Sequence, residues 1–241
     1  MKNDTLIVIP IRMGSSRFPG KPLIDINGRA MIYHVWKKAI LSRCGDVFVA
    51  CCDKEVKNYL IKKEIPYVMT KKNLYSGTDR VYSAMQILLK NNHYKYIINL
   101  QGDIPDISPL SIKKLASMIK VKAIQMATLV SKIKYSKTIK DKNIVKVALS
   151  KHGNFNRAFY FSRSPVPFGA SEFYEHIGIY AYKVDTLKRF VSLKVGELEK
   201  IESLEQLRAL EAGIQIIVGK VNKAPYSIDT PKDLKDFLKK S

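Results

Sequence analysis

Short apolar runs and amphipathic segments alternate regularly over residues 6–119, and this alternation limits the folds that the chain can adopt. Four β-like runs alternate with four helical patterns, at residues 6–11, 31–42, 46–51, 54–63, 67–69, 79–90, 96–100 and 109–119. Strands that alternate with helices in this way pair in parallel through right-handed crossovers. We therefore expect an α/β fold with a mostly parallel sheet flanked by helices.

The pattern changes after residue 122, where β-like runs follow one another with few helices between them. Four such runs, two helical patterns, one more strand and a last helix follow, at residues 123–130, 144–149, 157–161, 177–182, 185–192, 198–213, 214–218 and from 231 onward. No repeat, low-complexity tract or Gly/Ser linker divides the sequence. We expect a single domain over residues 1–241, with a β-rich layer inserted into the α/β sheet.

The composition excludes several classes of protein. A hydrophobic content of 46% argues against disorder, and there is no uninterrupted apolar run long enough to span a membrane. The first apolar run is too short for a secretory signal and lacks a small-residue cleavage site. Cys44, Cys51 and Cys52 show neither CxxC nor Cys/His metal spacing. We expect a cytoplasmic protein without membrane insertion.

The net charge of +21 is the unusual number in the composition. A charge this high is typical of nucleic-acid-binding proteins, and that function is kept as an alternative. Two observations weigh against it: lysines are spread over the whole chain, and only nine of the 42 basic residues are Arg, the residue that base readout favours. We therefore expect a solvated Lys-rich surface, whose field also favours a small anionic substrate, and no nucleic-acid partner.

The loop after the first β-like run carries the strongest local signal for function. Its cations and hydroxyl groups are interleaved with glycines, and they are Arg12, Ser15, Ser16, Arg17 and Lys21. Glycine lets the backbone approach an oxyanion, Ser donates to it, and Arg and Lys neutralise a polyphosphate. The loop follows a strand of the predicted sheet, at the edge where α/β proteins bind ligands. The alternative is a polar turn with surface cations.

Three further motifs lie where a loop meets a predicted strand or helix. Asp103, in Gln101-Gly102-Asp103, directly follows an apolar strand, from where a carboxylate can hold a divalent cation. Residues 76–80, Ser-Gly-Thr-Asp-Arg, put a tight turn and the cation of Arg80 at a helix start, and Asp229 precedes Thr230-Pro231 at another. Each motif also has a purely structural interpretation as a helix cap.

Polar residues in the second half are less informative on their own. Arg163 follows an aromatic strand, His176 and Tyr180 begin another, and Glu205 and Gln206 lie in the helical pattern 198–213. A hydrogen-bonded core histidine and a solvated helix face would explain these patterns without any ligand. The pattern alone assigns these residues no role.

Taken together, seven segments resemble one family in their order and spacing. They are residues 9–12 through 20–23, 76–80, 100–103, 160–163, 176–180, 204–208 and 229–231. Over nearly its whole length the chain resembles the 3-deoxy-manno-octulosonate cytidylyltransferases, also called CMP-Kdo synthetases.

The resemblance implies a nucleotidyltransferase that activates 3-deoxy-D-manno-octulosonate (Kdo) with CTP, giving CMP-Kdo and pyrophosphate for lipopolysaccharide biosynthesis. It also implies a Rossmann-like sheet of the nucleotide-diphospho-sugar transferase type, a Mg²⁺ requirement, and a homodimer formed through the β-rich layer. Residues 1–122 would then bind the nucleotide, residues 123–192 the sugar and the second subunit, and residues 193–241 would return to the main sheet.

Individual residues receive roles from the same resemblance. The CTP phosphates would be held by Arg12, Ser15, Ser16, Arg17 and Lys21, and the cytidine by Ser76, Gly77 and Arg80. Gln101 would contact nucleotide or sugar, and Asp103 and Asp229 would be metal ligands. Arg163 would pair with the Kdo carboxylate, and the sugar site would be lined by His176, Tyr180, Glu205 and Gln206. The catalytic set would be Arg12, Lys21, Asp103 and Asp229.

The chain departs from the family pattern at four positions. Many members have Ala, an acidic residue, Glu and Gly where this chain has Ile11, Lys54, Ile104 and Ser227. None of these four is a residue with an implied role. Two enzyme alternatives share the chemistry and differ in the sugar pocket: a CMP-sialic acid synthetase, and a cytidylyltransferase for an 8-amino Kdo analogue.

Overall fold

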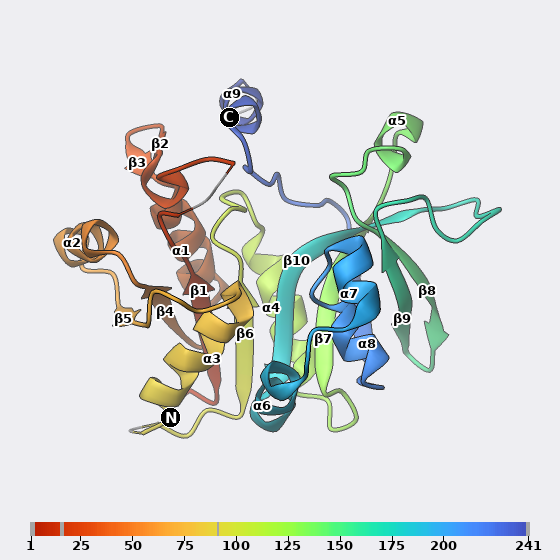
Figure 1. The fold of residues 1–241 in the computed structure, drawn as a ribbon, viewed down its shortest axis with the longest axis horizontal. Helices are drawn as coiled ribbons and strands as arrows, with labels where there is room; N and C mark the ends of the chain where they lie inside the picture. Colours follow the sequence, from red (N-terminus) through yellow and green to blue (C-terminus); the bar gives the residue numbers. More distant parts are fainter. Residues whose placement is uncertain (1–2, 15–16, 91, 240–241) are drawn as a thin grey trace. The chain divides into compact units, whose positions relative to one another are not determined.

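The computed structural model describes residues 3–14, 17–90 and 92–239, and the chain divides into two compact units (Figure 1). Unit 1 comprises the residues up to Lys113 and those from Pro225 onward, and unit 2 runs from Lys114 to Ala224. Unit 2 is thus inserted into the sequence of unit 1. None of the helices in the described part of the chain is long and apolar enough to cross a bilayer.

Unit 1 is built on four parallel strands in the order β5-β4-β1-β6. Its elements alternate along the chain as β1 (Thr5–Pro10), α1 (Met31–Ser42), β4 (Asp46–Cys51), α2 (Lys54–Lys62), β5 (Tyr67–Met69), α3 (Gly77–Leu88) and β6 (Tyr96–Leu100). Right-handed connections in this order place α1 and α2 on one face of the sheet and α3 on the other. Every residue of β1 is buried, as expected for a strand covered on both faces. The predicted alternation is confirmed, with every bound of these seven elements within two residues.

Short elements complete unit 1. A 3₁₀ helix, η1 (Lys21–Leu23), precedes the hairpin β2 (Asp25–Ile26) and β3 (Arg29–Ala30), and α9 (Pro231–Leu238) follows the chain's return. The hairpin was not expected. Its turn residues Asn27 and Gly28 both have positive φ, 50° and 81°, which a two-residue turn of the type I′ class requires. The helix α4 (Pro109–Ile119) crosses the boundary between the units and matches its prediction.

Unit 2 contains five strands in the order β10-β7-β11-β9-β8. Its elements are β7 (Met126–Lys132), α5 (Ser136–Ile139), β8 (Lys146–His152), β9 (Phe155–Ser162), β10 (Tyr174–Lys183), α6 (Val184–Ser192), α7 (Glu197–Glu202), α8 (Leu207–Glu211) and β11 (Ile216–Val221). The strand β11 runs parallel to β7, and the other described pairs of this unit are antiparallel. The expectation of a mostly parallel sheet therefore holds for unit 1, whereas the sheet of unit 2 is mixed.

The single helix expected over residues 198–213 is wrong. The structure has α7 and α8 instead, separated at Ser203, whose φ is 54°. A buried ion pair explains the break: Nε and Nη2 of Arg208 each donate to the Glu199 carboxylate at 2.6 Å. In one continuous helix these residues would lie on opposite faces and about 13 Å apart along the axis. The break therefore lets two buried charges neutralise each other.

Gly45 tests the packing of the two central strands. It precedes β4, and a Cβ placed there would lie 2.1 Å from the carbonyl oxygen of Thr5, the first residue of β1. Because the obstacle is backbone, Gly45→Ala must displace the β1–β4 pair, and we expect a loss of about 1–3 kcal/mol or more in the free energy of unfolding. Urea unfolding of both proteins measures this loss.

Gly14→Ala is the matched control. A Cβ at Gly14 meets nothing within 4 Å among the residues that the structure describes, so the free energy of unfolding of this variant should change by less than about 0.5 kcal/mol. Equal stability of the Gly45→Ala variant and the wild-type protein would contradict this account of the strand pair.

Candidate active site

A pocket of about 310 Å³ lies at the carboxyl ends of the unit 1 strands. The chain leaves β1 toward β4, while β6 lies on the other side of β1, and this reversal is where open α/β sheets bind ligands. The lining comes from five segments of unit 1: Pro10, Ile11, Arg12, Arg17, Lys21, Pro22, Met31, Ser76, Gly77, Arg80, Gln101, Gly102, Asp103 and Asp229. Nine of the residues predicted from the sequence are among them.

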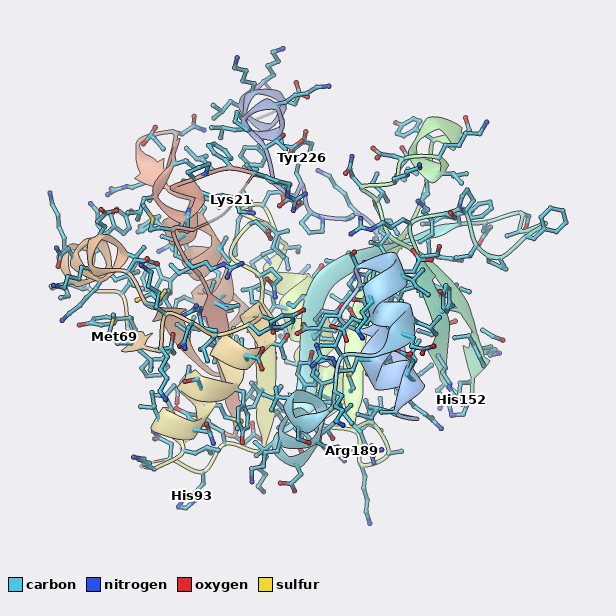
Figure 2. All side chains as sticks on the ribbon, viewed as in Figure 1. Lys21, Met69, His93, His152, Arg189 and Tyr226 are labelled. Carbon is cyan, nitrogen blue, oxygen red and sulfur yellow. The ribbon has the colours of Figure 1, made fainter. Side chains whose placement is uncertain are left out.

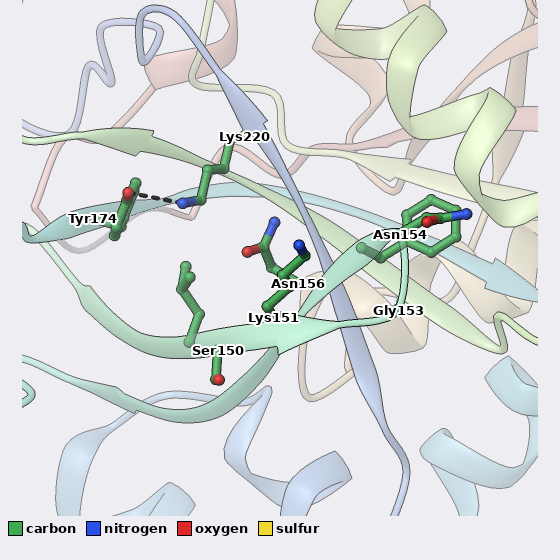
Figure 3. Close-up of a pocket in the computed structure, with 9 residues that line it drawn as sticks. Ser150, Lys151, Gly153, Asn154, Asn156, Tyr174 and Lys220 are labelled. Atoms are coloured by element: carbon green, nitrogen blue, oxygen red, sulfur yellow. Dashed lines mark hydrogen bonds between the residues drawn. The ribbon is translucent and has the colours of Figure 1, made fainter.

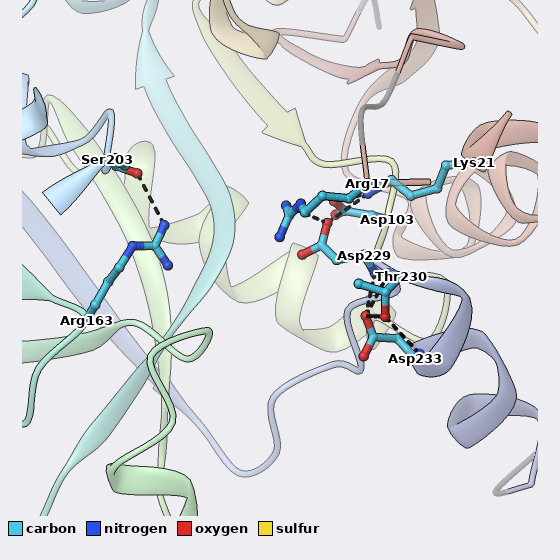
Figure 4. Close-up of polar contacts among 8 residues, drawn as sticks. All are labelled: Arg17, Lys21, Asp103, Arg163, Ser203, Asp229, Thr230 and Asp233. Carbon is cyan, nitrogen blue, oxygen red and sulfur yellow. Dashed lines mark hydrogen bonds and ion pairs between the residues drawn. The ribbon is translucent and has the colours of Figure 1, made fainter. Parts of the chain in front are cut away.

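The ammonium group of Lys21, which is labelled in Figure 2, joins the two predicted metal ligands. Its Nζ donates to Oδ2 of Asp103 at 2.9 Å and to Oδ1 of Asp229 at 3.0 Å (Figure 4). Nη2 of Arg17 reaches the same Asp229 oxygen at 3.1 Å. Burial acts to lower the pKa of Lys21, but the two carboxylates outweigh it and raise this pKa above its usual value. Lys21 therefore stays charged across the physiological range.

Local sequence explains how Lys21 and Asp229 reach this place. Gly20 has a φ of 73°, which favours glycine, and it turns the chain into η1, where Lys21 is the first residue. The backbone N–H of Ile228 donates to the carbonyl oxygen of Asp103 at 2.9 Å, tying the returning segment to the loop after β6. Thr230 caps α9 with a reciprocal bond to Asp233, and Pro231 occupies the first helical position. The helix start thus uses Thr230 as its cap and leaves the Asp229 carboxylate for Lys21.

Gly102 allows the loops after β1 and β6 to approach each other. A Cβ at this position would lie 2.6 Å from Cγ2 of Ile11 and 3.4 Å from the carbonyl oxygen of Pro10. The missing side chain therefore brings Asp103 beside the loop that carries Arg12. Arg12 is exposed and lines the pocket, whereas Ser15 and Ser16 lie outside the described residues.

The segment at the start of α3 combines a helix cap with a pocket wall. Ser76 forms a capping box with Asp79, which confirms the structural interpretation of this motif. Arg80 is only 2% exposed, and its Nη1 donates to Oγ1 of Thr70 at 2.5 Å. The Cβ position of Gly77 lies 3.6 Å from Oε1 of Gln101, so the start of α3 packs against the Gln101 side chain at this wall of the pocket.

One residue that the sequence analysis missed supports the cationic loop. Oδ2 of Asp53 accepts a hydrogen bond from the backbone N–H of Met13 at 2.9 Å, next to Arg12. Asp53 directly precedes α2 and lies two positions after the last residue of β4, Cys51. The argument that singled out Asp103, an acid just beyond a strand of the parallel sheet, also applies to Asp53 and would have found it.

The acidic residues of the pocket fit a magnesium site in which phosphate oxygens of the substrate complete the coordination of the metal. In the described part of the chain, no three His, Cys, Asp or Glu side chains gather as metal ligands would. Magnesium commonly takes only one or two carboxylates and fills its other positions with phosphate oxygens and water. Asp103 and Asp229 supply two hard oxygen donors within about 3 Å of a single nitrogen, and each uses one oxygen for Lys21. The donor set thus fits Mg²⁺ bound together with a polyphosphate.

In unit 2, a bulge in β10 brings His176 beside Tyr180. The register with β7 shifts between Ile177 and Tyr180, and Oγ1 of Thr128 donates to the carbonyl oxygen of Ile179 at 2.8 Å inside the bulge. Oγ1 of Thr128 also lies 3.0 Å from Nε2 of His176, and the ring centroids of His176 and Tyr180 are 5.2 Å apart. Bulges commonly redirect side chains in this way. Thr128 was not singled out from the sequence, since its role depends on the bulge.

Arg163 is held by backbone carbonyl groups. Its Nε donates to the carbonyl of Glu202 at 2.9 Å, and its Nη1 donates to that of Lys142 at 3.1 Å. Its Nη2 donates to the carbonyl of Ser203 at 3.4 Å (Figure 4). Glu205 and Gln206 follow in the junction between α7 and α8. Nε2 of Gln206 is buried and has no hydrogen-bond partner in the part of the chain that the structure describes, so it is a donor available to a ligand.

A larger hollow of about 690 Å³ lies on unit 2, beside the hairpin of β8 and β9 (Figure 3). Its lining is polar and basic, and Nζ of Lys220 donates to the hydroxyl group of Tyr174 at 2.8 Å. None of the site residues predicted from the sequence lines it. The pocket of unit 1 is therefore the better candidate for the chemistry.

Comparison with known proteins establishes the family. The profile of the family described as Cytidylyltransferase matches residues 6–216. A 3-deoxy-manno-octulosonate cytidylyltransferase of Paramagnetospirillum magneticum is 43% identical over 231 residues, which cover 95% of this chain and 94% of that protein. The chain belongs to the 3-deoxy-manno-octulosonate cytidylyltransferase family. A cytidylyltransferase of the same name from Rhodopseudomonas palustris strain BisB5 has the same identity and coverage.

Solved structures agree with this family membership. The structure of a CMP:2-keto-3-deoxy-manno-octonic acid synthetase in complex with CTP has a TM-score of 0.90 and 36% identity to this chain, and 98% of each chain is covered. A cytidylyltransferase from Leptospira borgpetersenii, at 14% identity and a TM-score of 0.65, shares the fold. The nucleotidyltransferase α/β fold expected from the sequence is confirmed at this level, while the roles of individual residues in this cytidylyltransferase remain predictions.

We expect His176 to make the free energy of unfolding of this chain depend on pH. Desolvation lowers the pKa of His176 to about 3, from an ordinary value of 6.5. Between these two values the unfolded chain binds the additional proton, so the free energy of unfolding should fall as the pH is lowered from 6.5 toward 3. The slope from this group is at most about 1.4 kcal/mol per pH unit.

Urea unfolding at pH 5 and pH 7.5 measures this effect. His176→Gln should reduce the loss of stability at the lower pH relative to the wild-type protein. His152→Gln, at the exposed end of β8, is the control and should leave that loss unchanged (Figure 2). An identical pH dependence in all three proteins would show that His176 is not held neutral by the fold.

Proposed function

We propose that this chain transfers a cytidylyl group from CTP to Kdo, forming CMP-Kdo and pyrophosphate for lipopolysaccharide biosynthesis. The observation that carries the proposal is the pocket in which Lys21 lies between Asp103 and Asp229, in a chain 43% identical to a named 3-deoxy-manno-octulosonate cytidylyltransferase. A cationic loop and two carboxylates at one sheet edge suit a metal-bound nucleoside triphosphate.

The nucleotide is assigned to the pocket of unit 1. The triphosphate would contact the cationic loop, through Arg12, Ser15, Ser16, Arg17 and Lys21, and the cytidine would lie against Ser76, Gly77 and Arg80. The nearly complete burial of Arg80 supports this assignment, because its contact with Thr70 fixes a rigid wall. Gln101, whose Oε1 lies 3.6 Å from the Cβ position of Gly77, would contact the nucleotide or the sugar.

Magnesium is part of the proposal. Asp103 and Asp229 would hold it, and when bound it would neutralise the triphosphate and polarise its phosphoryl oxygens. Lys21 contacts both carboxylates, so it fixes their separation before substrate arrives. Such preorganisation lowers the cost of placing charge in the pocket.

The reaction needs little covalent chemistry from the protein. The anomeric hydroxyl of the sugar would attack the α-phosphorus of CTP in line and release its proton to solvent, a new oxygen–phosphorus bond would form, and the bond to pyrophosphate would break. Lys21, Arg12 and Arg17 would stabilise the charge on the phosphoryl oxygens and the leaving group. A thiol nucleophile is not indicated, because burial raises the pKa of Cys51 to about 12 and also raises that of Cys52.

The sugar is assigned to residues of unit 2. Arg163 would pair with the Kdo carboxylate, and the other contacts would come from His176, Tyr180, Glu205 and Gln206. The unpartnered Nε2 of Gln206 supports a polar ligand there. The division into residues 1–122 for the nucleotide, 123–192 for sugar and dimerisation, and 193–241 returning to the main sheet belongs to the same proposal. So do the homodimer and the cytoplasmic location.

Pyrophosphate release tests the proposal directly. Purified protein with CTP, Mg²⁺ and Kdo should release pyrophosphate, and 8-amino Kdo and N-acetylneuraminate should be poorer acceptors. Preference for one of those two sugars would support the corresponding alternative cytidylyltransferase. Absence of turnover with all three, together with nucleic-acid retention at moderate ionic strength and a steep salt dependence, would instead favour the nucleic-acid-binding alternative.

Asp103→Ala tests the metal role within this assay. Removing one carboxylate from the pair should lower kcat about 100-fold or more, since it takes away charge that acts on the transition state. Titration with Mg²⁺ should fail to restore the rate. Asp185→Ala is the matched control, because the Asp185 side chain is 95% exposed on α6. Wild-type rates for the Asp103 variant would contradict the assignment.

A further inference from the structure

A buried lysine in unit 2 has no part in the function proposed so far. Lys146, the first residue of β8, is 0% exposed. Its Nζ donates to the carbonyl oxygens of Asp141 at 2.9 Å, of Ile144 at 2.7 Å, and of Arg163. An ammonium group has three N–H donors, and all three are used.

This arrangement is a costly way to fill a buried position. Burial lowers the pKa of Lys146, because desolvation disfavours the charged ammonium. An apolar side chain would fill the same space without that penalty. What the ammonium group adds is a simultaneous hold on three backbone carbonyls from two different segments.

Both segments determine the position of Arg163. One of the three carbonyls is that of Arg163 itself, so Lys146 fixes its main chain. The other two belong to the loop that includes Lys142, whose carbonyl accepts from Nη1 of Arg163 at 3.1 Å. Lys146 therefore holds the backbone of Arg163 and also the loop against which its guanidinium rests.

The opposite side of Arg163 is fixed by the end of α7. The carboxylate of Glu202 accepts from the backbone N–H of Arg163 at 2.9 Å, and the carbonyls of Glu202 and Ser203 accept from its side chain. Three of the five guanidinium N–H groups are thus used, and among the described contacts one N–H on each terminal nitrogen is left. Two such donors are what a carboxylate takes in a bidentate pair.

We infer that Lys146 is a positioning residue for the sugar acid, acting through Arg163 to hold two guanidinium donors ready for its carboxylate. The inference rests on the proposed function, because it assumes that Arg163 receives the Kdo carboxylate. Lys146 itself is fully buried and does not touch the substrate.

Two substitutions and a control isolate this role. Lys146→Met keeps an unbranched side chain that is one atom shorter and removes all three donors. Lys146→Gln keeps two N–H donors and is the variant to use if the Met variant is too unstable. Lys151→Met makes the same change at an exposed position of the same strand. Thermal unfolding is measured for each variant, and KM for Kdo, KM for CTP and kcat are measured by pyrophosphate release.

The Met variant should raise the KM for Kdo by about 10- to 100-fold, because small misplacements of a binding group have effects of this size. Its KM for CTP should stay within about twofold of wild type, and the Gln variant should show a smaller rise for Kdo. The control should match wild type. Equal increases in both KM values, or an unchanged KM for Kdo in whichever Lys146 variant folds, would overturn the inference.

A double-mutant cycle with Arg163→Ala separates positioning from general destabilisation. Arg163→Ala alone should raise the KM for Kdo far more than that for CTP. If Lys146 acts through Arg163, adding the Lys146 substitution should then change the KM for Kdo no further. Additive effects would overturn the positioning role while leaving the proposed function standing. A wild-type protein without CTP- and Kdo-dependent turnover would overturn the proposed function, and this inference with it.

Discussion

One ammonium group, that of Lys21, joins three parts of unit 1 that are far apart in the sequence. It bonds Asp103 after β6 and Asp229 before α9, at 2.9 and 3.0 Å. Without a cation between them, two carboxylates this close would repel each other. The ammonium offsets that repulsion and leaves a second oxygen on each carboxylate. The two oxygen donors proposed for the metal are therefore already held in place by one side chain.

Much of the fold of unit 1 follows from local pattern, because its strands and helices have distinct periodicities. The helix at 31–42 and the strand at 46–51 coincide with their predicted bounds. The break at Ser203 could not be predicted in this way, since it depends on an ion pair between Glu199 and Arg208 that forms only in the folded chain. The β2–β3 hairpin is different: the Asn27-Gly28 pair is a local turn signal, so the sequence alone is enough to predict this hairpin.

The candidate site likewise combines residues that the sequence predicts with contacts that only the folded chain reveals. The cationic composition of the loop after β1 singled out Lys21, and a strand-end position singled out Asp103, because parallel strands deliver their loops to one edge of the sheet. The contact of Lys21 with Asp229 needed the structure, as did the hydrogen bond by which Asp53 supports the backbone of Met13. Lys146 shows the limit most clearly. Lysine is usually exposed, and the sequence around Lys146 does not predict that its side chain is buried among three carbonyl groups.

The insertion of unit 2 has a consequence for synthesis on the ribosome. Lys21 and Asp103 emerge early, whereas Asp229 follows only after the whole of unit 2 has been made. The contact between Lys21 and Asp229 joins residues 208 positions apart, so it forms late and at a cost in loop-closure entropy. A nascent chain can therefore acquire the strands of unit 1 while its cationic loop still lacks the second carboxylate. A fragment from translation interrupted before that aspartate would contain Lys21 and Asp103 without the second carboxylate that Lys21 contacts.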